Sequence, residues 1–221
     1  MATILFVLTG ADHWTLADGT RHPTGFWAEE FLAPHRAFTE AGHRVEVATP
    51  GGVVPTVDRA SLEDGAEERL AAVPELRAPR DLKEVDLDDY AAVFYPGGHG
   101  PMEDLATDRS SGELLARALA SGRPLGVVCH GPAALLAAQD ADGASPFAGY
   151  RLTAFTNAEE EQAGFAGKAR WLLQDRLEEI GVDFQAGAPW EPHVVSDRNL
   201  HTGQNPGSSA PLAAEILKAL G

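Results

Sequence analysis

Short runs of consecutive apolar residues recur along the chain, and longer segments with helical periodicity separate them. Such runs are typical of strands buried on both faces of a parallel sheet, and they occupy residues 3–8, 45–48, 90–95 and 125–128. Shorter runs at 150–155, 182–185, 193–196 and 200–203 predict further strands. Helical patterns occupy 25–41, 63–73, 110–121 and 169–180, and a last helix ends at Leu220. This alternation predicts a doubly wound α/β fold, with a mostly parallel sheet sandwiched by helices.

The apolar pattern breaks between Thr9 and Thr24. Gly10 and the Ala17-Asp18-Gly19 segment are typical of turns, so we expect a surface loop here. This loop follows the carboxyl end of the first strand, the end of a parallel sheet at which functional loops gather. We therefore predict a single domain over residues 1–221, with a lid-like loop at about 10–24 that covers a pocket.

Composition excludes several classes of partner. Acidic residues outnumber basic residues by 33 to 17, a formal net charge of −16, which argues against nucleic acid and anionic membranes and is compatible with a small neutral substrate. No apolar run approaches the length of a membrane span, and the first residues lack the pattern of a secretory signal. One cysteine allows no intramolecular disulfide, so we expect a cytoplasmic protein.

That cysteine, Cys129, lies between the apolar run at 125–128 and a helical pattern that starts with Pro132. A residue in a sharp strand-to-helix turn projects its side chain beside backbone N–H groups that no helical carbonyl satisfies. The helix N-terminus and the adjacent His130 favour a thiolate, so we predict a nucleophile with a lowered thiol pKa. The alternative is a small apolar residue in the core, since free cysteine is among the most buried residue types.

A glycine-rich turn, Gly97-Gly98-His99-Gly100, follows the strand predicted at 90–95. Glycines at the end of a strand let backbone N–H groups point into a cavity, where they can stabilise an oxyanion. A phosphate-binding loop is excluded because the P-loop Lys and Ser/Thr are missing. An ordinary tight turn is the remaining alternative.

Acidic residues begin two of the predicted helices. Glu29 and Glu30 fall in the first turns of the helix at 25–41, where carboxylates are usually solvated. If Glu30 faces the sheet instead, burial raises its pKa and it can hold or pass a proton. Glu159, Glu160 and Glu161 begin a helix capped by Thr or Asn, and one of them could orient a histidine. The eight histidines show no H-x-x-x-H spacing and there is no C-x-x-C pair, so we expect no metal site.

In combination, three of these features resemble the ThiJ/PfpI superfamily. They are Cys129-His130-Gly131-Pro132-Ala133, the Tyr95-Pro96-Gly97-Gly98-His99-Gly100 turn, and Glu30 four residues ahead of Pro34. That superfamily has the flavodoxin-like fold of class I glutamine amidotransferases. The segments 24–30, 48–52, 155–160 and 202–206 look like its branch of glutathione-independent glyoxalases (glyoxalase III) and holding chaperones.

The resemblance implies roles for individual residues. Cys129 matches the family nucleophile, His130 the histidine that follows it, and Glu30 the carboxylate that contacts the cysteine sulfur. Gly98 and the backbone of His130 match the oxyanion and substrate-binding donors. The third member of the triad is an acid shortly after the strand at 150–155, which points to Glu160, with Glu159 as the alternative.

The resemblance also implies an activity. It is that of a cofactor-independent lyase of the glyoxalase III, or D-lactate dehydratase, type, which converts methylglyoxal to lactate through a Cys129 hemithioacetal with Glu30 as the base. The same site is compatible with protein deglycation. The alternative is a stress-related holding chaperone or redox sensor with a large exposed apolar patch, and a peptidase or amidase ranks below both. We expect a small dicarbonyl substrate, no cofactor and a homodimer.

Overall fold

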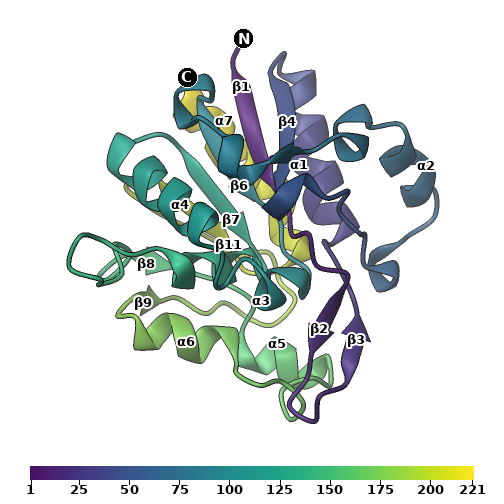
Figure 1. The fold of residues 1–221 in the computed structure, drawn as a ribbon, viewed down its shortest axis with the longest axis vertical. Helices are drawn as coiled ribbons and strands as arrows, with labels where there is room; N and C mark the ends of the chain where they lie inside the picture. Colours follow the sequence, from purple (N-terminus) through teal and green to yellow (C-terminus); the bar gives the residue numbers. More distant parts are fainter.

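The computed structural model describes residues 1–221 and has a seven-stranded sheet at its centre, in the order β10-β11-β7-β6-β1-β4-β5 (Figure 1). Every neighbouring pair runs parallel except β10 and β11. The strands are β1 (Thr3–Val7), β4 (Arg44–Thr49), β5 (Arg80–Asp81), β6 (Ala92–Tyr95), β7 (Leu125–Val128), β10 (Val194–Asp197) and β11 (Leu200–Gly203). The predicted fold class, a mostly parallel sheet flanked by helices, is confirmed.

Helices cover both faces of this sheet (Figure 1). On one face, α1 (Ala28–Glu40) and α7 (Ser209–Leu220) pack on alternate strand residues such as Ile4 and Phe6. On the other face, α4 (Arg109–Ser121) packs on the residues between them, such as Leu5 and Val7. Consecutive residues of a strand point to opposite faces, so a continuous apolar run supplies two cores at once.

The remaining elements are short and lie around the sheet. The helices are α2 (Ala66–Ala71), α3 (Gly100–Glu103), α5 (Asn157–Gln162) and α6 (Leu173–Glu179). Two small separate sheets pair β2 (His13–Thr15) with β3 (Arg21–Pro23) and β8 (Arg151–Leu152) with β9 (Asp183–Phe184). No helix is both long enough and apolar enough to cross a bilayer.

The segment at 10–24 corrects the sequence interpretation, because it is a β-hairpin and not an irregular loop. Trp14 pairs with His22 across β2 and β3, and Gly19 with its φ of 85° makes the turn. Three residues per strand are too few to show an alternating pattern in sequence. The side chain of Trp14 is nevertheless buried, so tertiary packing defines the hairpin.

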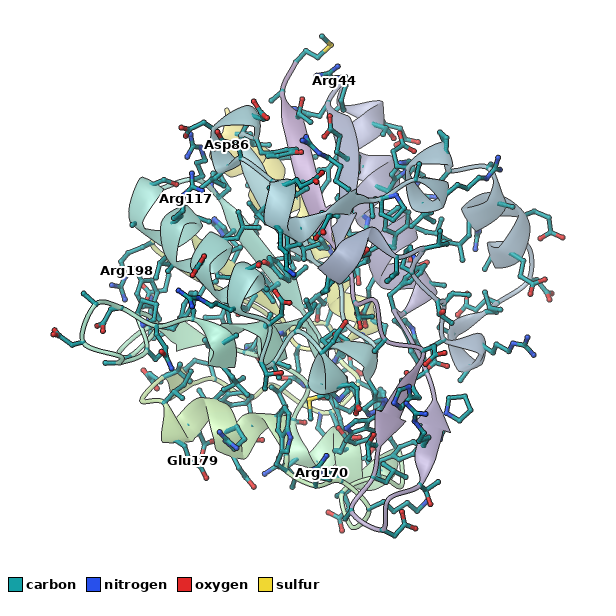
Figure 2. The ribbon with its side chains drawn as sticks, in the orientation of Figure 1. Arg44, Asp86, Arg117, Arg170, Glu179 and Arg198 are labelled. Carbon is teal, nitrogen blue, oxygen red and sulfur yellow. The ribbon has the colours of Figure 1, made fainter.

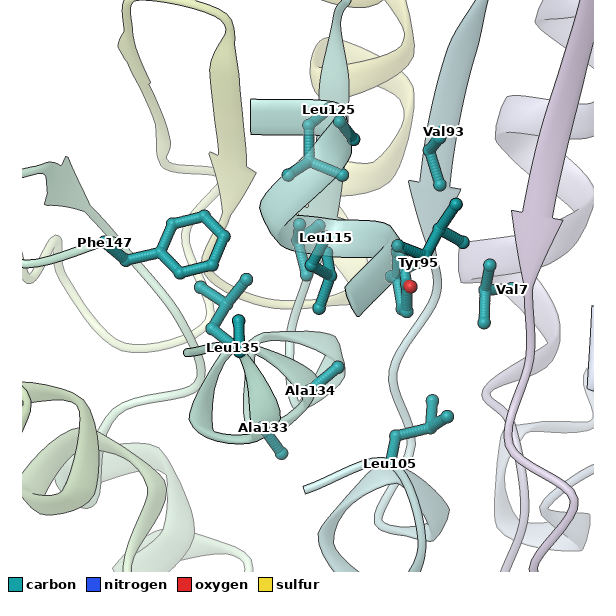
Figure 3. Packing of buried hydrophobic residues seen from close by; sticks show 14 of the residues in the cluster. Val7, Val93, Tyr95, Leu105, Leu115, Leu125, Ala133, Ala134, Leu135 and Phe147 are labelled. Carbon is teal, nitrogen blue, oxygen red and sulfur yellow. The ribbon is translucent and has the colours of Figure 1, made fainter. Parts of the chain in front are cut away.

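The segment after Cys129 also differs, since residues Gly131–Ala137 form a 3₁₀ helix and not an α-helix. It is enclosed by α4 and by Phe147 (Figure 3). A Cβ on Gly112 of α4 would lie 2.2 Å from the carbonyl oxygen of Ala137, so the two backbones are in direct contact there. Close packing therefore overrides the α-helical preference of the Ala/Leu series.

Two other elements are shorter than predicted. Of residues 150–155 only Arg151–Leu152 form a strand, because Thr153 donates its N–H to the side chain of Thr202 and Phe155 donates its N–H to the carbonyl of Cys129. The helix predicted at 169–180 begins only at Leu173, after Leu172 in an extended conformation.

The charged side chains labelled in Figure 2 lie on the outside of the molecule. Arg117 and Asp86, for example, form an exposed ion pair with an N–O distance of 3.3 Å. Pairs exposed to water in this way contribute little to stability. The two cores described above, and not surface charge, therefore hold the sheet and its helices in place.

Candidate active site

Cys129 follows the last residue of β7 in a left-handed conformation, with φ of 59°. Neighbouring segments hold its backbone on both sides: its N–H donates to the carbonyl of Gly203 and its carbonyl accepts from Phe155, both at 2.9 Å. A positive φ costs a non-glycine residue roughly 1 kcal/mol or more and persists only where the surroundings impose it. The sharp turn predicted from the sequence is present, and it orients the thiol.

The glycine-rich turn after β6 brings backbone donors to the same point. Gly98 has φ of 87°, and a Cβ there would lie 2.4 Å from the carbonyl oxygen of Gly25, so only glycine fits. The backbone N–H groups of Gly98 and His130 lie close enough to the sulfur of Cys129 to lower the pKa of its thiol. The two donors predicted for the oxyanion site are therefore adjacent to the thiol.

Glu30 is fully buried on the first turn of α1, whereas its neighbour Glu29 is exposed. One carboxyl oxygen, Oε2, accepts the N–H of Gly97 at 2.6 Å, and the carboxyl also interacts with the thiol of Cys129. Oε1 has no hydrogen-bond partner of regular geometry. Burial raises the pKa of Glu30 to about 8, although the contacts with Cys129 and Gly97 oppose the shift. Glu30 therefore carries a proton at neutral pH.

The predicted lowering of the thiol pKa is wrong. Burial raises the pKa of Cys129 above its ordinary value and the Glu30 carboxyl raises it further, while the N–H groups of Gly98 and His130 lower it. The sequence argument assumed a solvated thiol at the start of a full α-helix. The structure instead has a buried thiol before a short 3₁₀ helix, so the thiol keeps its proton until a partner accepts it.

His130 connects the thiol to a carboxylate. Its Nδ1 lies 3.3 Å from the sulfur of Cys129, and its Nε2 lies 2.7 Å from Oε2 of Glu160. Burial alone would raise the pKa of Glu160, but His130 and His99 lower it to well below the usual range. Glu160 is therefore ionised and fixes the orientation of the imidazole, an arrangement suited to moving the thiol proton.

Of the two glutamates considered from the sequence, the structure places Glu160 against His130, while Glu159 has a different environment. Glu159 forms a capping box with Thr156 at the start of α5. Its Oε1 also accepts hydrogen bonds from the backbone N–H of Trp190 and from the side-chain amides of Gln204 and Asn205. Glu159 thus holds three separate segments together behind the site.

Glu159→Gln is accordingly expected to lower the free energy of unfolding by about 2 kcal/mol, because an amide cannot accept all the hydrogen bonds that the buried carboxylate accepts. Urea unfolding followed by circular dichroism measures the loss. Glu161→Gln, at an exposed neighbouring position, is the matched control and should change stability by less than about 0.5 kcal/mol. Equal stabilities for the two variants would contradict this role for Glu159.

His99, to which the sequence assigned no role, is part of the same group. Its Nε2 lies 2.8 Å from Oε1 of Glu160, and its ring stacks on Trp14 of the hairpin at 4.5 Å between centroids. The ligand atoms of His99, His130 and Glu160 lie within 4.8 Å of one another, a combination of residue types that can hold a zinc ion. Local spacing could not reveal this group, since its members come from three elements far apart in the chain.

These residues face a cavity of about 140 Å³. Its wall is largely aromatic, formed by Trp27, Phe155, Phe165 and Trp190, and its polar lining outside the group of Cys129 consists of His22 and Asp58. His22 comes from the hairpin, which lies beside α3 (Figure 1). His22 is the one residue of 10–24 that lines the cavity, and a lid formed by this segment stays a prediction. The space admits only a small substrate beside the thiol.

The chain is similar in sequence and in fold to several known proteins. A model of the DJ-1/PfpI family matches residues 23–219. The protein/nucleic acid deglycase HchA of Pseudomonas aeruginosa (strain UCBPP-PA14) is 32% identical over 235 residues, which cover 98% of this chain and 80% of that protein. The Rapid Encystment Protein 24 kDa of Francisella tularensis superposes with a TM-score of 0.91 at 26% identity over 100% of both chains. Glyoxalase III from Candida albicans superposes with a TM-score of 0.84 at 24% identity, covering 99% of this chain and 97% of that one, which shows a common fold.

Proposed function

The chain belongs to the DJ-1/PfpI family, and we propose that it is a glutathione-independent glyoxalase that converts methylglyoxal to lactate without a cofactor. One observation carries the proposal: a single thiol, Cys129, lies between a protonated buried carboxyl, Glu30, and an imidazole that an ionised Glu160 orients. This arrangement supplies a nucleophile together with two groups that can move protons.

The first half of the reaction makes a covalent adduct. The sulfur of Cys129 adds to the aldehyde carbon of methylglyoxal, and His130 accepts the thiol proton and passes it to the former aldehyde oxygen, which gives a hemithioacetal. The N–H groups of Gly98 and His130 lie beside the sulfur and can donate to this oxygen as negative charge develops on it.

The second half moves a proton between two carbons. Glu30, in its ionised form, takes the proton from the former aldehyde carbon and an enediol forms, after which a proton returns to the neighbouring carbon. The product is a lactate thioester of Cys129. Water then cleaves the C–S bond, which releases lactate and restores the thiol. The balance is one methylglyoxal and one water consumed for one lactate formed. This route makes the enzyme a lyase of the lactate dehydratase type.

The surroundings support a small aldehyde as substrate. The cavity is small, and His22 of the hairpin and Trp190 are among the residues that line it, which leaves little room for an extended peptide and disfavours a peptidase. A holding chaperone would require a large exposed apolar surface. Only four large apolar residues are exposed, at three separate places: Met1, Val53 with Val54, and Trp190. The chaperone alternative therefore has no structural feature in its favour.

Turnover of methylglyoxal in the absence of glutathione tests the proposal. The purified protein is expected to consume methylglyoxal and to release an equal amount of lactate, which chromatography quantifies. A protein that leaves methylglyoxal unchanged would remove the glyoxalase assignment. A peptide carrying methylglyoxal adducts is the second substrate, because the relative from P. aeruginosa is named a deglycase.

The assembly and location of the protein stay predictions. We propose a homodimer in the cytoplasm that binds a small dicarbonyl compound. Light scattering coupled to size-exclusion chromatography is expected to give twice the mass of one chain, 23.4 kDa. A monomer mass would contradict the dimer.

A further inference from the structure

A second imidazole, that of His99, contacts the carboxylate that orients His130. Oε1 of Glu160 lies 2.8 Å from Nε2 of His99, and Oε2 lies 2.7 Å from Nε2 of His130. An ionised carboxylate can only accept hydrogen bonds. The hydrogen of each imidazole therefore lies on Nε2. In a neutral His99 the other nitrogen, Nδ1, carries a lone pair.

The side chain of His99 lines the cavity, and its Nδ1 atom is left without a partner. It accepts no hydrogen bond from the protein, and it is not among the polar atoms sealed from solvent. The side chain of His99 is 11% exposed against 2% for His130, and His99 lines the cavity beside Cys129. Burial lowers the pKa of His99 and the neighbouring imidazole of His130 lowers it further, while Glu160 and Asp58 oppose this. His99 is thus a neutral base facing the space where substrate lies.

Packing fixes the direction in which this base points. The indole of Trp14 stacks on the ring of His99 with 11° between the planes, and the ring of His130 lies 4.1 Å away on centroids. The ring of Phe165 also packs on the ring of His99, with 5.2 Å between the centroids. A base held in this way by a carboxylate and by ring stacking loses little entropy when it acts, which is how a pre-positioned catalytic group gains its advantage.

The proposed reaction ends with hydrolysis of the lactate thioester. In the group formed by Cys129, His130 and Glu30, no residue is yet assigned as the base for this step. The lactate thioester must react with water, so one group must take a proton from that water and another must return a proton to the sulfur. Nδ1 of His130 faces the sulfur at 3.3 Å, which suits it to the second task. Nothing in that group is placed to accept a proton from water on the cavity side of the thioester.

We propose that His99 is the general base of thioester hydrolysis, an inference that rests on the proposed glyoxalase function. Nδ1 of His99 removes a proton from water as its oxygen bonds to the thioester carbon. The C–S bond then breaks and the electron pair goes to the sulfur. His130 takes the proton of the newly formed carboxyl group and passes it to the sulfur, which restores the thiol. The proton on His99 leaves with the product solution, so each turnover releases one lactate and one proton. Glu160 stabilises the imidazolium formed at each histidine in turn.

His99→Gln tests this assignment, because a glutamine amide can still donate to Glu160 but cannot act as a base. With methylglyoxal in excess, we expect a burst of consumption of about one molecule per active site, followed by lactate release roughly 10²–10³-fold slower than in the wild type. Intact-mass spectrometry should then show one added lactoyl group, and peptide mapping should place it on Cys129. Hydroxylamine, which cleaves thioesters, should remove it.

A merely structural role for His99 gives a different result. If the loss of its contact with Glu160 only misplaces His130, the burst and the steady rate fall together and no lactoyl group accumulates, which overturns the inference. If His99→Gln does not fold, His99→Asn is tested in its place with the same burst and mass measurements. His201→Gln is the matched control, since His201 is another buried histidine, bonded to Ser196 and outside the cavity. It should accumulate no acyl group.

The same experiment separates this inference from the function on which it rests. Wild-type protein that produces no lactate overturns both. Wild-type turnover together with unchanged lactate release in His99→Gln overturns only the assignment of His99.

Discussion

Cys129→Ala is expected to abolish lactate formation from methylglyoxal, with a loss of at least about 10⁴-fold. No other thiol exists in the chain, so no neighbouring residue can form the hemithioacetal. The remaining residues of the site still bind the aldehyde, but binding without a covalent bond leaves the proton on the aldehyde carbon insufficiently acidic for Glu30. Chromatographic measurement of lactate and of residual methylglyoxal provides the test.

The fold of Cys129→Ala should persist, because the change removes one buried atom and leaves the backbone contacts with Gly203 and Phe155 in place. We expect a decrease in the free energy of unfolding of about 1 kcal/mol. Cys129→Ser is the matched control: it keeps a hydroxyl at the same point, with a far weaker nucleophile, and should be as inactive. Turnover at the wild-type rate in either variant would exclude the covalent mechanism.

Glu30→Gln is expected to reduce lactate formation by about 10²–10⁴-fold, the usual contribution of a general base. The amide oxygen can still accept the N–H of Gly97, so the turn keeps its shape, but it cannot remove the substrate proton. The thiol still adds to the aldehyde and the reaction stops at the hemithioacetal.

For the wild type we expect kcat/KM to rise with pH up to about 8, the pKa to which burial raises Glu30, as the fraction of ionised base increases. The variant should lack this rise.

The same substitution should stabilise the protein at alkaline pH. The folded-state pKa of Glu30, about 8, exceeds its ordinary value of 4.5, so between these two pH values the folded state binds the proton that the unfolded state has lost. Unfolding free energy therefore falls as pH rises through this window, by roughly 1 kcal/mol per pH unit. Below pH 4.5 the buried carboxyl causes no loss of stability, and above about pH 8 the loss has reached its full size. A glutamine carries no such proton, so denaturation of Glu30→Gln at pH 9 should require more urea than the wild type does.

Glu29→Gln is the matched control for both measurements, since Glu29 is exposed on the same turn of α1. Its activity, its pH profile and its stability should remain those of the wild type. A wild-type pH profile in Glu30→Gln would assign the proton transfer to another group. A variant less stable than the wild type at pH 9 would show that the carboxyl of Glu30 is favourably ionised.

Local patterns predicted the central strands well because a strand buried on both faces must be apolar throughout, and such runs are rarely found elsewhere. The runs at 3–8, 90–95 and 125–128 correspond to β1, β6 and β7, and the turns that follow β6 and β7 contain Gly98 and Cys129. The prediction of secondary structure from the hydrophobic pattern failed at 10–24 and 150–155. At 10–24 a short hairpin is held by a distant contact, that of Trp14 with His99, and at 150–155 the strand ends where Thr153 donates its N–H to the side chain of Thr202.

The sequence by itself determined the order of strands and helices, the turn that presents Cys129, and the set of residue types in the site, because each depends on neighbours within a few residues. Tertiary structure decided which carboxylates act and in what state. Adjacent residues on a helix point about 100° apart, so Glu30 is buried while Glu29 is exposed, and Glu160 meets His130 while Glu159 binds Trp190. Which way a helix faces depends on what packs against it. The same packing buries Glu30 and Cys129, which keeps both protonated, and it places His99 beside Glu160.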